Sequence, residues 1–394
     1  MPWKNLSHLV LLPELELIAF KAPRRSWVRY FAQRRSSMEV CPKCASPSQS
    51  VYDHRSVVLK DSPIRGQMVY LEIKKRRFWC KPCQKPFTEY IPGVRKGFRS
   101  TERFRRDVLW ACENFVDLGR VQRAYRISAG YVFKTLYSRL EEKLRMRQYP
   151  WPETVGIDEH SFRKNRKHRR TEFASVFIDY SNRRMFEVVE GKSQEDLRAG
   201  LQHIEGRERV KNAVVDLCDP FKNYVRENFP NARIVADKFH VLRLITPALL
   251  KKRHEITGTR ADARARRLLL CSSNRLDNWE RVTIWRYLEQ HPELQELYRW
   301  KERLHKLYRT RGYDRAREAF KNLVDEMSLS STQEIKTLRR TLLKWREEIL
   351  NYFLTGLTNG RTEGYNNLAK LVQKRAFGYK SFRNYRLRLL SACA

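Results

Sequence analysis

The sequence lacks long hydrophobic runs and any recognisable export signal. It contains no stretch of about 18 uncharged apolar residues, so we predict no membrane span. The apolar start is interrupted by Glu14 and Glu16 and has no signal-peptide cleavage pattern. We therefore expect the chain to work in the reducing cytoplasm, where disulfides are rare.

The chain is also poor in acidic residues. It has 44 Asp and Glu against 81 Lys and Arg, a net charge of +37 over 394 residues. A surplus of this size predicts a polyanionic partner. Aromatic residues at 12% and hydrophobic residues at 41% argue against a disordered basic tail, so the charge is expected on folded surface. Residues 1–150 hold +18 of it, which favours contact with DNA over several domains.

Half of the eight cysteines form two Cys-x2-Cys pairs. Cys41 and Cys44 make the first, Cys80 and Cys83 the second, and 35 residues separate them. Each pair offers two thiolates in a tight turn, and four thiolates close a tetrahedral zinc site. The pattern predicts a zinc ribbon with one structural Zn²⁺. The alternatives are four unrelated buried cysteines, or a site in which His54 replaces one ligand.

Residues 96–150 have the pattern of a helix-turn-helix domain. The segment "RISAGYV" places Ser128 as the N-cap of a third helix after a tight turn, the arrangement that offers a recognition helix to a major groove. We expect Tyr131, Lys134 and Thr135 near its exposed face, as DNA-contacting residues. A plain three-helix connector is the alternative.

After Pro152 the pattern predicts three strands, a helix, a strand, a helix and a strand. Ser193 is the expected N-cap of the first helix, with Asp196 at its third position. This order is that of an RNase H-like sheet, in which the first and fourth strands are neighbours. A strongly helical segment follows, including "PELQELYRWKERLHKLYR" with one apolar stripe.

Three carboxylates stand out in this half of the chain. Asp158 lies on the first predicted strand, Asp216 near the end of the fourth and Glu363 on a late helix. A charge after an apolar strand must be paired or bind metal. If the three converge, they can hold two Mg²⁺ (or Mn²⁺) ions about 4 Å apart, as phosphodiester chemistry requires.

Ordinary roles remain open for each of these positions. Glu159 lies beside Asp158 and is an equal candidate ligand. Asp219 competes with Asp216, although it is the better candidate for a helix cap before Pro220. Asp237 also ends a strand, and an aspartate there is often only a cap or an ion-pair partner.

The late helix, about residues 361–374, has an amide and basic side. Asn366, Asn367 and Lys370 follow Glu363 at i+3, i+4 and i+7, and with Lys374 they are our candidate DNA-facing residues. Leu368, Leu371 and Val372 are expected on the opposite, core side. The alternative for the basic side chains is a solvated face.

The sequence resembles the DDE transposases of the ISL-three family of bacterial insertion sequences over nearly its whole length. The resemblance rests on "CPKC…CKPC", "GIDEHSFRK", "VVDLCDPF", "FPNARIVADKFHV" and "NGRTEGYNNLAKLVQKRAFGYKSFRNYRLRLL". It implies an RNase H-like core with a helical insertion, and the DDE triad then falls on Asp158, Asp216 and Glu363. Asp237 and His240 match its "DKFH" element, for which we expect a structural or DNA-positioning role.

Together these observations predict a multidomain α+β protein. Its expected parts are a β region with the zinc ribbon (1–95), the helix-turn-helix (96–150), the first part of the RNase H-like core (151–245), an all-helical insertion (246–357) and a final core helix (358–394). The resemblance implies metal-dependent cleavage and 3′-OH transfer of double-stranded DNA, acting on the element's terminal inverted repeats and target DNA as a nucleoid-associated homodimer.

Two other functions fit parts of the pattern. A non-catalytic DNA-binding regulator built from the same domains would keep the ribbon and the helix-turn-helix but would not need the carboxylates. An RNA-processing nuclease would need the carboxylates but leaves the two DNA-binding elements unexplained.

Overall fold

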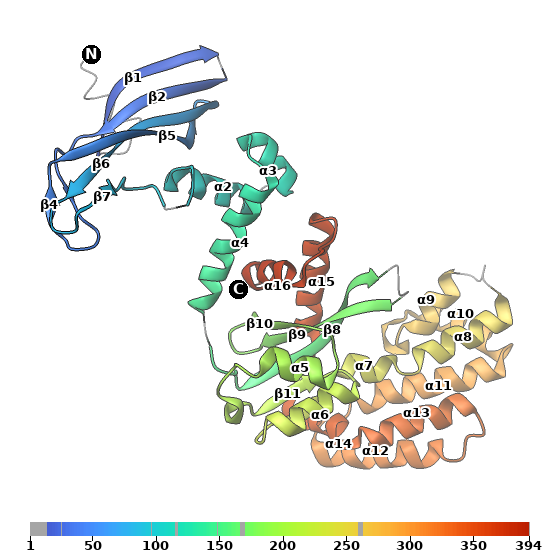
Figure 1. Cartoon of the computed structure of the whole chain (residues 1–394). Helices are drawn as coiled ribbons and strands as arrows, with labels where there is room; N and C mark the ends of the chain where they lie inside the picture. The colour runs from blue at the N-terminus through green and yellow to red at the C-terminus, as the bar shows by residue number, and fades with distance from the viewer. Residues whose placement is uncertain are drawn as a thin grey trace. The chain divides into compact units, whose positions relative to one another are not determined.

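The computed structural model describes residues 14–24, 26–95, 97–114, 117–147, 149–165, 170–258 and 263–393, and all statements below concern these residues. The chain divides into two compact units, Met1–Glu142 and Lys143–Ala394. Figure 1 labels their elements.

The first unit starts with a five-stranded sheet. Strands β1 (Leu15–Arg24), β2 (Trp27–Arg34), β6 (Gln67–Cys80) and β5 (Val51–Ile64) pair in that order, and β7 (Lys85–Thr88) pairs antiparallel with the end of β6. A short ribbon of β3 (Glu39–Val40) and β4 (Pro47–Ser48) forms a separate two-stranded sheet. One face of the main sheet buries Leu71, Ile73 and their neighbours, as alternation along the strands requires.

Helices follow the sheet: α2 (Glu102–Asn114), α3 (Leu118–Tyr125) and α4 (Ala129–Arg145). Asp117 accepts a hydrogen bond from the Arg120 amide and caps α3, which ends at Arg126 in the left-handed conformation (φ 49°). The Ser128 hydroxyl accepts from the Tyr131 amide at 3.2 Å, so the predicted cap of α4 is confirmed.

The second unit is built on a five-stranded sheet in the order β10-β9-β8-β11-β12. Its strands are β8 (Thr154–Asn165), β9 (Arg170–Asp179), β10 (Arg184–Glu190), β11 (Asn212–Val215) and β12 (Arg233–Ala236). The first three pair antiparallel, whereas β8, β11 and β12 run parallel. The predicted strand order and the predicted pairing of the first and fourth strands are confirmed.

Helices α5 (Gln194–Leu201) and α6 (Asp219–Asn228) connect the strands, with the 3-10 turn η1 (Arg207–Arg209) before β11. Ser193 and Asp196 form the predicted capping box at the start of α5. Asp219 does not cap α6 through its side chain. It lies in the first turn and its carboxylate accepts from the Lys344 ammonium at 2.5 Å.

A run of helices follows β12. It comprises α7 (Lys238–Arg243), α8 (Thr246–Thr257), α9 (Ala263–Leu270), η2 (Ser273–Arg275), α10 (Asn278–Glu289), α11 (Pro292–Leu307), α12 (Tyr313–Met327), α13 (Gln333–Lys344) and α14 (Arg346–Thr355). The predicted stripe on α11 is buried at Leu294, Leu297, Leu304 and Leu307.

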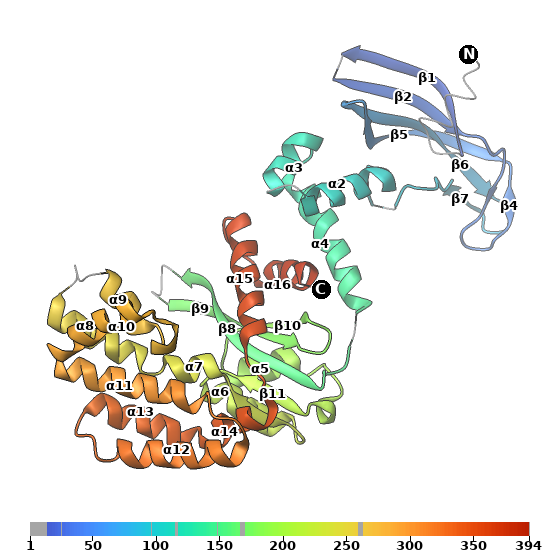
Figure 2. The same cartoon turned by 180° about the vertical axis from the view of Figure 1, so that it is seen from behind.

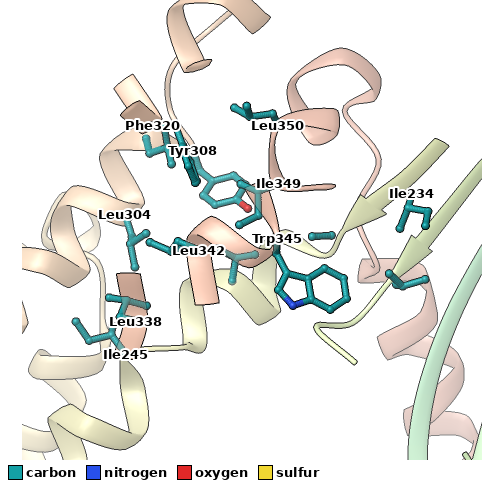
Figure 3. Close-up of a cluster of buried hydrophobic side chains, with 14 of the residues drawn as sticks. Ile234, Ile245, Leu304, Tyr308, Phe320, Leu338, Leu342, Trp345, Ile349 and Leu350 are labelled. Carbon is teal, nitrogen blue, oxygen red and sulfur yellow. The ribbon is translucent and has the colours of Figure 1, made fainter. Parts of the chain in front are cut away.

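These helices share one hydrophobic core with the sheet. Figure 3 shows Trp345 between the strand that carries Ile234 and the helices that carry Leu304 and Leu342. All four side chains belong to one buried cluster. The helical insertion is therefore packed on the sheet as part of the same folded unit.

The chain ends with α15 (Gly360–Arg375) and α16 (Phe382–Ala392). Alternation along the strands decides which side they cover. Val155, Ile157 and Val215 face the core shared with the insertion. Val214 and Val235 face the opposite side, where they pack with Ala369 of α15 and Tyr385 of α16. Figure 2 shows α15 and α16 from behind.

Candidate active site

Asp158 and Asp216 meet at neighbouring strands. β8 and β11 are parallel, with Ile157 opposite Val215, so the two aspartates occupy the next position of the same register. Both alternate onto the side of the sheet that α15 covers, because Gly156 and Val214 precede them by two residues. The expected convergence of the first and fourth strands at these residues is thus observed.

His240 completes a cluster with the two aspartates. Its Nδ1 lies 3.0 Å from Asp216 Oδ1 and 2.9 Å from Asp237 Oδ2. Asp158, Asp216 and His240 each offer a ligand atom within 4.8 Å of the others. Asp237 is buried and accepts from the His240 amide, so it caps α7 and fixes the imidazole. The structural role expected for Asp237 is observed.

The electrostatics of the cluster favour a cation. Burial, followed by the nearby Asp216, raises the pKa of the Asp158 carboxyl to about 8. Burial alone would lower the pKa of His240, but hydrogen bonds to Asp216 and Asp237 outweigh it and raise that pKa to about 10. Two carboxylates so close ionise together only beside positive charge, which the His240 imidazolium supplies next to Asp216 but which leaves the Asp158 pKa raised. Carboxylate oxygens are the hard ligands that a divalent cation such as Mg²⁺ prefers, and such a cation would balance their negative charge.

Two asparagines of the last segment hold the aspartates. Asn359 Nδ2 donates to Asp216 Oδ1 at 3.0 Å, and Asn366 Nδ2 donates to Asp158 Oδ2 at 2.5 Å. The backbone amide of Asn359 also donates to Asp237 Oδ1 at 2.8 Å. These contacts fix the start of α15 against the strand ends. Asn366 is only 6% exposed and contacts an aspartate, whereas we expected it to face DNA.

Glu363 lies between these two asparagines along α15. It follows Asn359 by one turn and precedes Asn366 by one turn, and its amide donates to the Asn359 carbonyl at 3.0 Å. Its side chain is exposed and is not among the ligand atoms of the described cluster. The helix thus carries Glu363 between the two asparagines that contact the aspartates, while its carboxylate remains outside the Asp158–Asp216–His240 group.

A close contact lets α15 approach the strand. A Cβ atom at Gly156 would lie 2.5 Å from Tyr180 Cε1 and 2.7 Å from Thr362 Oγ1. The Tyr180 hydroxyl donates to the Thr358 carbonyl at 2.9 Å. Glycine in "VGIDEH" is therefore required by packing of the helix start.

A pocket of about 530 Å³ opens at this edge. Asp158, Asp216 and His240 line it together with Asn366 and Lys370. Glu159 also lines it but pairs with Lys192 at 2.8 Å, so Asp158 is the better candidate ligand. Asn367 and Lys374 are exposed on the same helix, whereas Leu371, expected on the core side, is 50% exposed. Ala369 occupies the buried side instead.

His160 adds a feature that the sequence did not single out. Its Nε2 lies 2.5 Å from the Tyr385 hydroxyl, and burial lowers its pKa to about 4, so the ring is neutral at pH 7. Its Nδ1 and Asn366 Oδ1 are both buried, and the Asn366 side chain raises the pKa of the ring against the larger effect of burial. Only the alternation of "GIDEHSF", which puts His160 on the side of Asp158, signals its place in the site.

The four paired cysteines form the second cluster. Their Sγ atoms lie within 4.8 Å of one another, and Cys44 Sγ is 3.4 Å from Cys80 Sγ. Tetrahedral zinc with Zn–S bonds near 2.3 Å needs sulfurs about 3.8 Å apart. His54 is exposed on β5 and is not part of the group. The cluster has the ligand set of a closed structural zinc site.

Two similar turns place these thiols. Ala45 (φ 57°) follows Cys44 and Gln84 (φ 51°) follows Cys83, and both adopt the left-handed conformation. Hydrogen bonding to Ser46 lowers the pKa of Cys44 to about 6, while hydrogen bonding to Cys44 raises that of Cys83 to about 12. Four thiols this close ionise together only around a cation, which fits Zn²⁺.

The residues expected on the exposed face of α4 divide into three cases. Lys134 is exposed, with its ammonium 4.5 Å from the centre of the Phe98 ring. Tyr131 is half-buried and its hydroxyl lies 2.6 Å from Ser100 Oγ. Thr135 is fully buried, so the expectation of exposure was wrong there. The helix turns this side toward α2.

No described helix is long and apolar enough to cross a membrane.

Comparison with known proteins gives a consistent result. The family model of the ISL3 DDE transposases, described as "Transposase", matches residues 155–389. A model described as the zinc-finger of transposase IS204/IS1001/IS1096/IS1165 matches residues 38–83. The transposase for insertion sequence element IS1001 of Bordetella parapertussis is 25% identical over 367 residues, covering 90% of this chain and 88% of its own. The transposase for IS1557 of Mycobacterium tuberculosis is 24% identical over 349 residues, covering 79% and 76%.

Proposed function

The chain belongs to the ISL3 family of DDE transposases, and we propose that it binds the terminal repeats of its insertion sequence and catalyses Mg²⁺-dependent strand cleavage and 3′-OH strand transfer. Its catalytic carboxylates are Asp158, Asp216 and Glu363. The family match does not favour the alternative of a non-catalytic regulator.

One observation carries this proposal. Asp158 and Asp216 come from adjacent parallel strands and meet in an open pocket, and α15 is fixed above them by two asparagine side chains. Such paired carboxylates in a pocket with a shifted pKa are typical of catalytic metal sites. The strand order and the mixed sheet support an RNase H-like core.

Asp158, Asp216 and Glu363 would hold the catalytic cations. Two such ions would activate the attacking water or 3′-OH and stabilise the leaving oxygen of the phosphodiester. In this proposal Glu363 joins the aspartates from its exposed position by a change of side-chain rotamer, because the backbone of α15 is already fixed at Asn359 and Asn366.

The neighbouring residues position these groups. Asn366 orients Asp158, and Asn359 with His240 orients Asp216. Lys370 lines the pocket one turn beyond Asn366 and is placed to contact a phosphate of the bound strand.

DNA recognition belongs, in this proposal, to the first unit. The zinc ribbon and the helix-turn-helix expected from α2–α4 would both contact the duplex, and Lys134 is exposed on α4. A net charge of +37 provides the electrostatic attraction to DNA phosphates that does not depend on sequence. Because transposition joins two element ends, we propose a homodimer on DNA, with target DNA as the second substrate.

The test is Glu363→Gln in a cleavage assay on a duplex that carries the element's own end. Loss of a residue that only contacts a metal ligand costs up to about 100-fold in activity, and Glu363 is proposed as a ligand itself. We therefore expect the cleavage rate to fall more than about 100-fold, while DNA binding is unchanged. Glu318→Gln, an exposed glutamate on α12, is the matched control and should cleave normally. Nicking and joining by Glu363→Gln at the wild-type rate would refute the assignment.

A further inference from the structure

The loop after α15 holds an aromatic side chain in an unusual position. Phe377 is 91% exposed, the largest value among the exposed large hydrophobic side chains of the described chain. Its φ is 53°, in the left-handed region. Six described non-glycine residues have positive φ, and Phe377 is the aromatic one among them. A bulky residue in this conformation is a genuine outlier.

The local hydrogen bonds show why the backbone turns left-handed there. The Phe377 amide donates to the Lys374 carbonyl at 3.1 Å, and the Gly378 amide donates to the Gln373 carbonyl at 3.0 Å. This pair of bonds is a Schellman motif, which normally places glycine at the position of Phe377. The fold therefore gains nothing from the phenyl ring, and glycine would suit the turn better.

The neighbouring aromatic residues behave differently. Tyr379 and Phe382 both pack against the buried Tyr385, with ring centres 5.2 and 6.2 Å apart. Phe377 has no ring contact within the described part of the chain, although it lies only two residues before Tyr379. The loop thus points one ring outward while its other rings anchor α16 to the sheet.

The surroundings of this ring are positively charged. Residues 364–394 contain no Asp or Glu, and their cations are Lys370, Lys374, Arg375, Lys380, Arg383, Arg386 and Arg388. A second copy of the chain would bring the same positive charge to the same place and repel it. A polyanion would be attracted, so charge complementarity selects DNA as the partner.

We propose that Phe377 is a DNA wedge that opens a base step of the bound element end and stacks on the exposed base. This inference rests on the proposed function for the presence of DNA along α15. Glu363 lies near the start of α15 and Phe377 lies two residues past its end, 14 residues further along the chain. At a helical rise of about 1.5 Å per residue this separation is about 21 Å, or roughly six base pairs of B-DNA. Aromatic side chains inserted between bases are a known means of bending and unstacking DNA.

The test places 2-aminopurine at successive positions about three to nine base pairs from the cleavage site of an element-end duplex. Complexes are formed with full-length protein without divalent cation, so that no strand is cut. We expect wild-type protein to raise fluorescence at one or two adjacent positions, which reports unstacking. Phe377→Gly should abolish the rise and weaken binding about fivefold or more, the lower range for loss of one base–aromatic stack.

Two further variants distinguish insertion of the Phe377 ring into DNA from a structural role of the side chain. Phe377→Trp should keep the fluorescence rise. Leu329→Gly removes another exposed loop side chain, 87% exposed in the same unit, and should leave the rise unchanged. The melting temperature of Phe377→Gly should stay equal or increase, because glycine suits the left-handed position.

An unchanged fluorescence rise and affinity in Phe377→Gly would overturn the wedge. So would a loss of dimer in light scattering with DNA unstacking intact, since the ring would then contact a second copy. A wild-type protein that unstacks the duplex but never cuts it when Mg²⁺ is added would overturn the proposed function and leave the wedge standing.

Discussion

The two metal-ligand clusters of this chain are assembled in opposite ways. The four cysteines come from residues 41–83 and are placed by two local turns, each with a left-handed residue after the second cysteine. The proposed catalytic carboxylates span residues 158–363 and depend on the pairing of β8 with β11 and on the docking of α15. The first cluster is complete without help from distant parts of the chain, and the second is not.

This difference corresponds to what each site must do. A closed set of four thiolates leaves no position for substrate and adds its binding free energy to folding. An open group of carboxylates keeps ligand positions available for a reacting strand. In the second cluster His240 and the two asparagines supply positive or hydrogen-bonding partners for the aspartates, while Glu363 stays exposed. The cysteine site, built from local turns, can thus hold its metal permanently, whereas the carboxylate site, built by tertiary contacts, stays open to substrate.

The largest effect should come from breaking the closed site. Cys80→Ser removes one of four zinc ligands, and apparent zinc-binding free energies of structural sites are about 10–16 kcal/mol. We expect metal analysis to find one zinc per wild-type chain and none in the variant, with the melting transition of the first unit lost or lowered. Cys271→Ser, a half-buried cysteine of the second unit, should keep its zinc. A folded wild-type protein without zinc would contradict the ribbon.

A smaller effect should follow from loosening the open site. Asn366→Ala removes the donor to Asp158, and loss of such a partner costs about 10- to 100-fold in metal affinity or activity. We expect the Mg²⁺ concentration for half-maximal cleavage to rise by this factor. Asn367→Ala, the exposed neighbour, is the control and should keep the wild-type requirement. Identical metal titrations for the two variants would mean that Asn366 does not position Asp158.

The smallest effect is expected at the rim of the pocket. Lys370→Ala should weaken DNA binding modestly and reduce the slope of log affinity against log salt by about 1, the value for one phosphate contact. Lys321→Ala, exposed on α12, should leave the slope unchanged. If the slope of log affinity against log salt is the same for wild type and Lys370→Ala, Lys370 does not contact a phosphate.

The sequence predicts the local features well and the tertiary ones unevenly. The capping box at Ser193, the cap at Ser128 and the cysteine pairs are short-range patterns, and all are present. The pairing of β8 with β11 was also predictable, because alternating strands and helices restrict the sheet order. Along α15 the predicted core side is correct for Leu368 and Val372, which pack against the core, but wrong for Leu371. The buried Asn366 lies outside that apolar pattern.

Asn366 and Thr135 illustrate that limit. Both are polar and were expected to face outward, yet both are buried. Asn366 is buried because it donates a hydrogen bond to a carboxyl group 208 residues earlier in the chain, a contact that no helical pattern shows. The place of His240 beside Asp216 likewise depends on a tertiary contact, because α7, which Asp237 caps, brings its imidazole to the aspartate. Polar burial is decided by partners, and partners are set by the tertiary fold.

The helical insertion also imposes an order in time on the second cluster. Glu363 is translated 147 residues after Asp216 (residues 216 and 363), which takes roughly 7–30 s at ~5–20 residues per second. Asn359 and Asn366, which hold the aspartates, are made equally late. A nascent chain therefore carries its first unit and both aspartates through about 147 residues of further synthesis before α15 is made, and chains released by the ribosome in that interval lack the helix altogether.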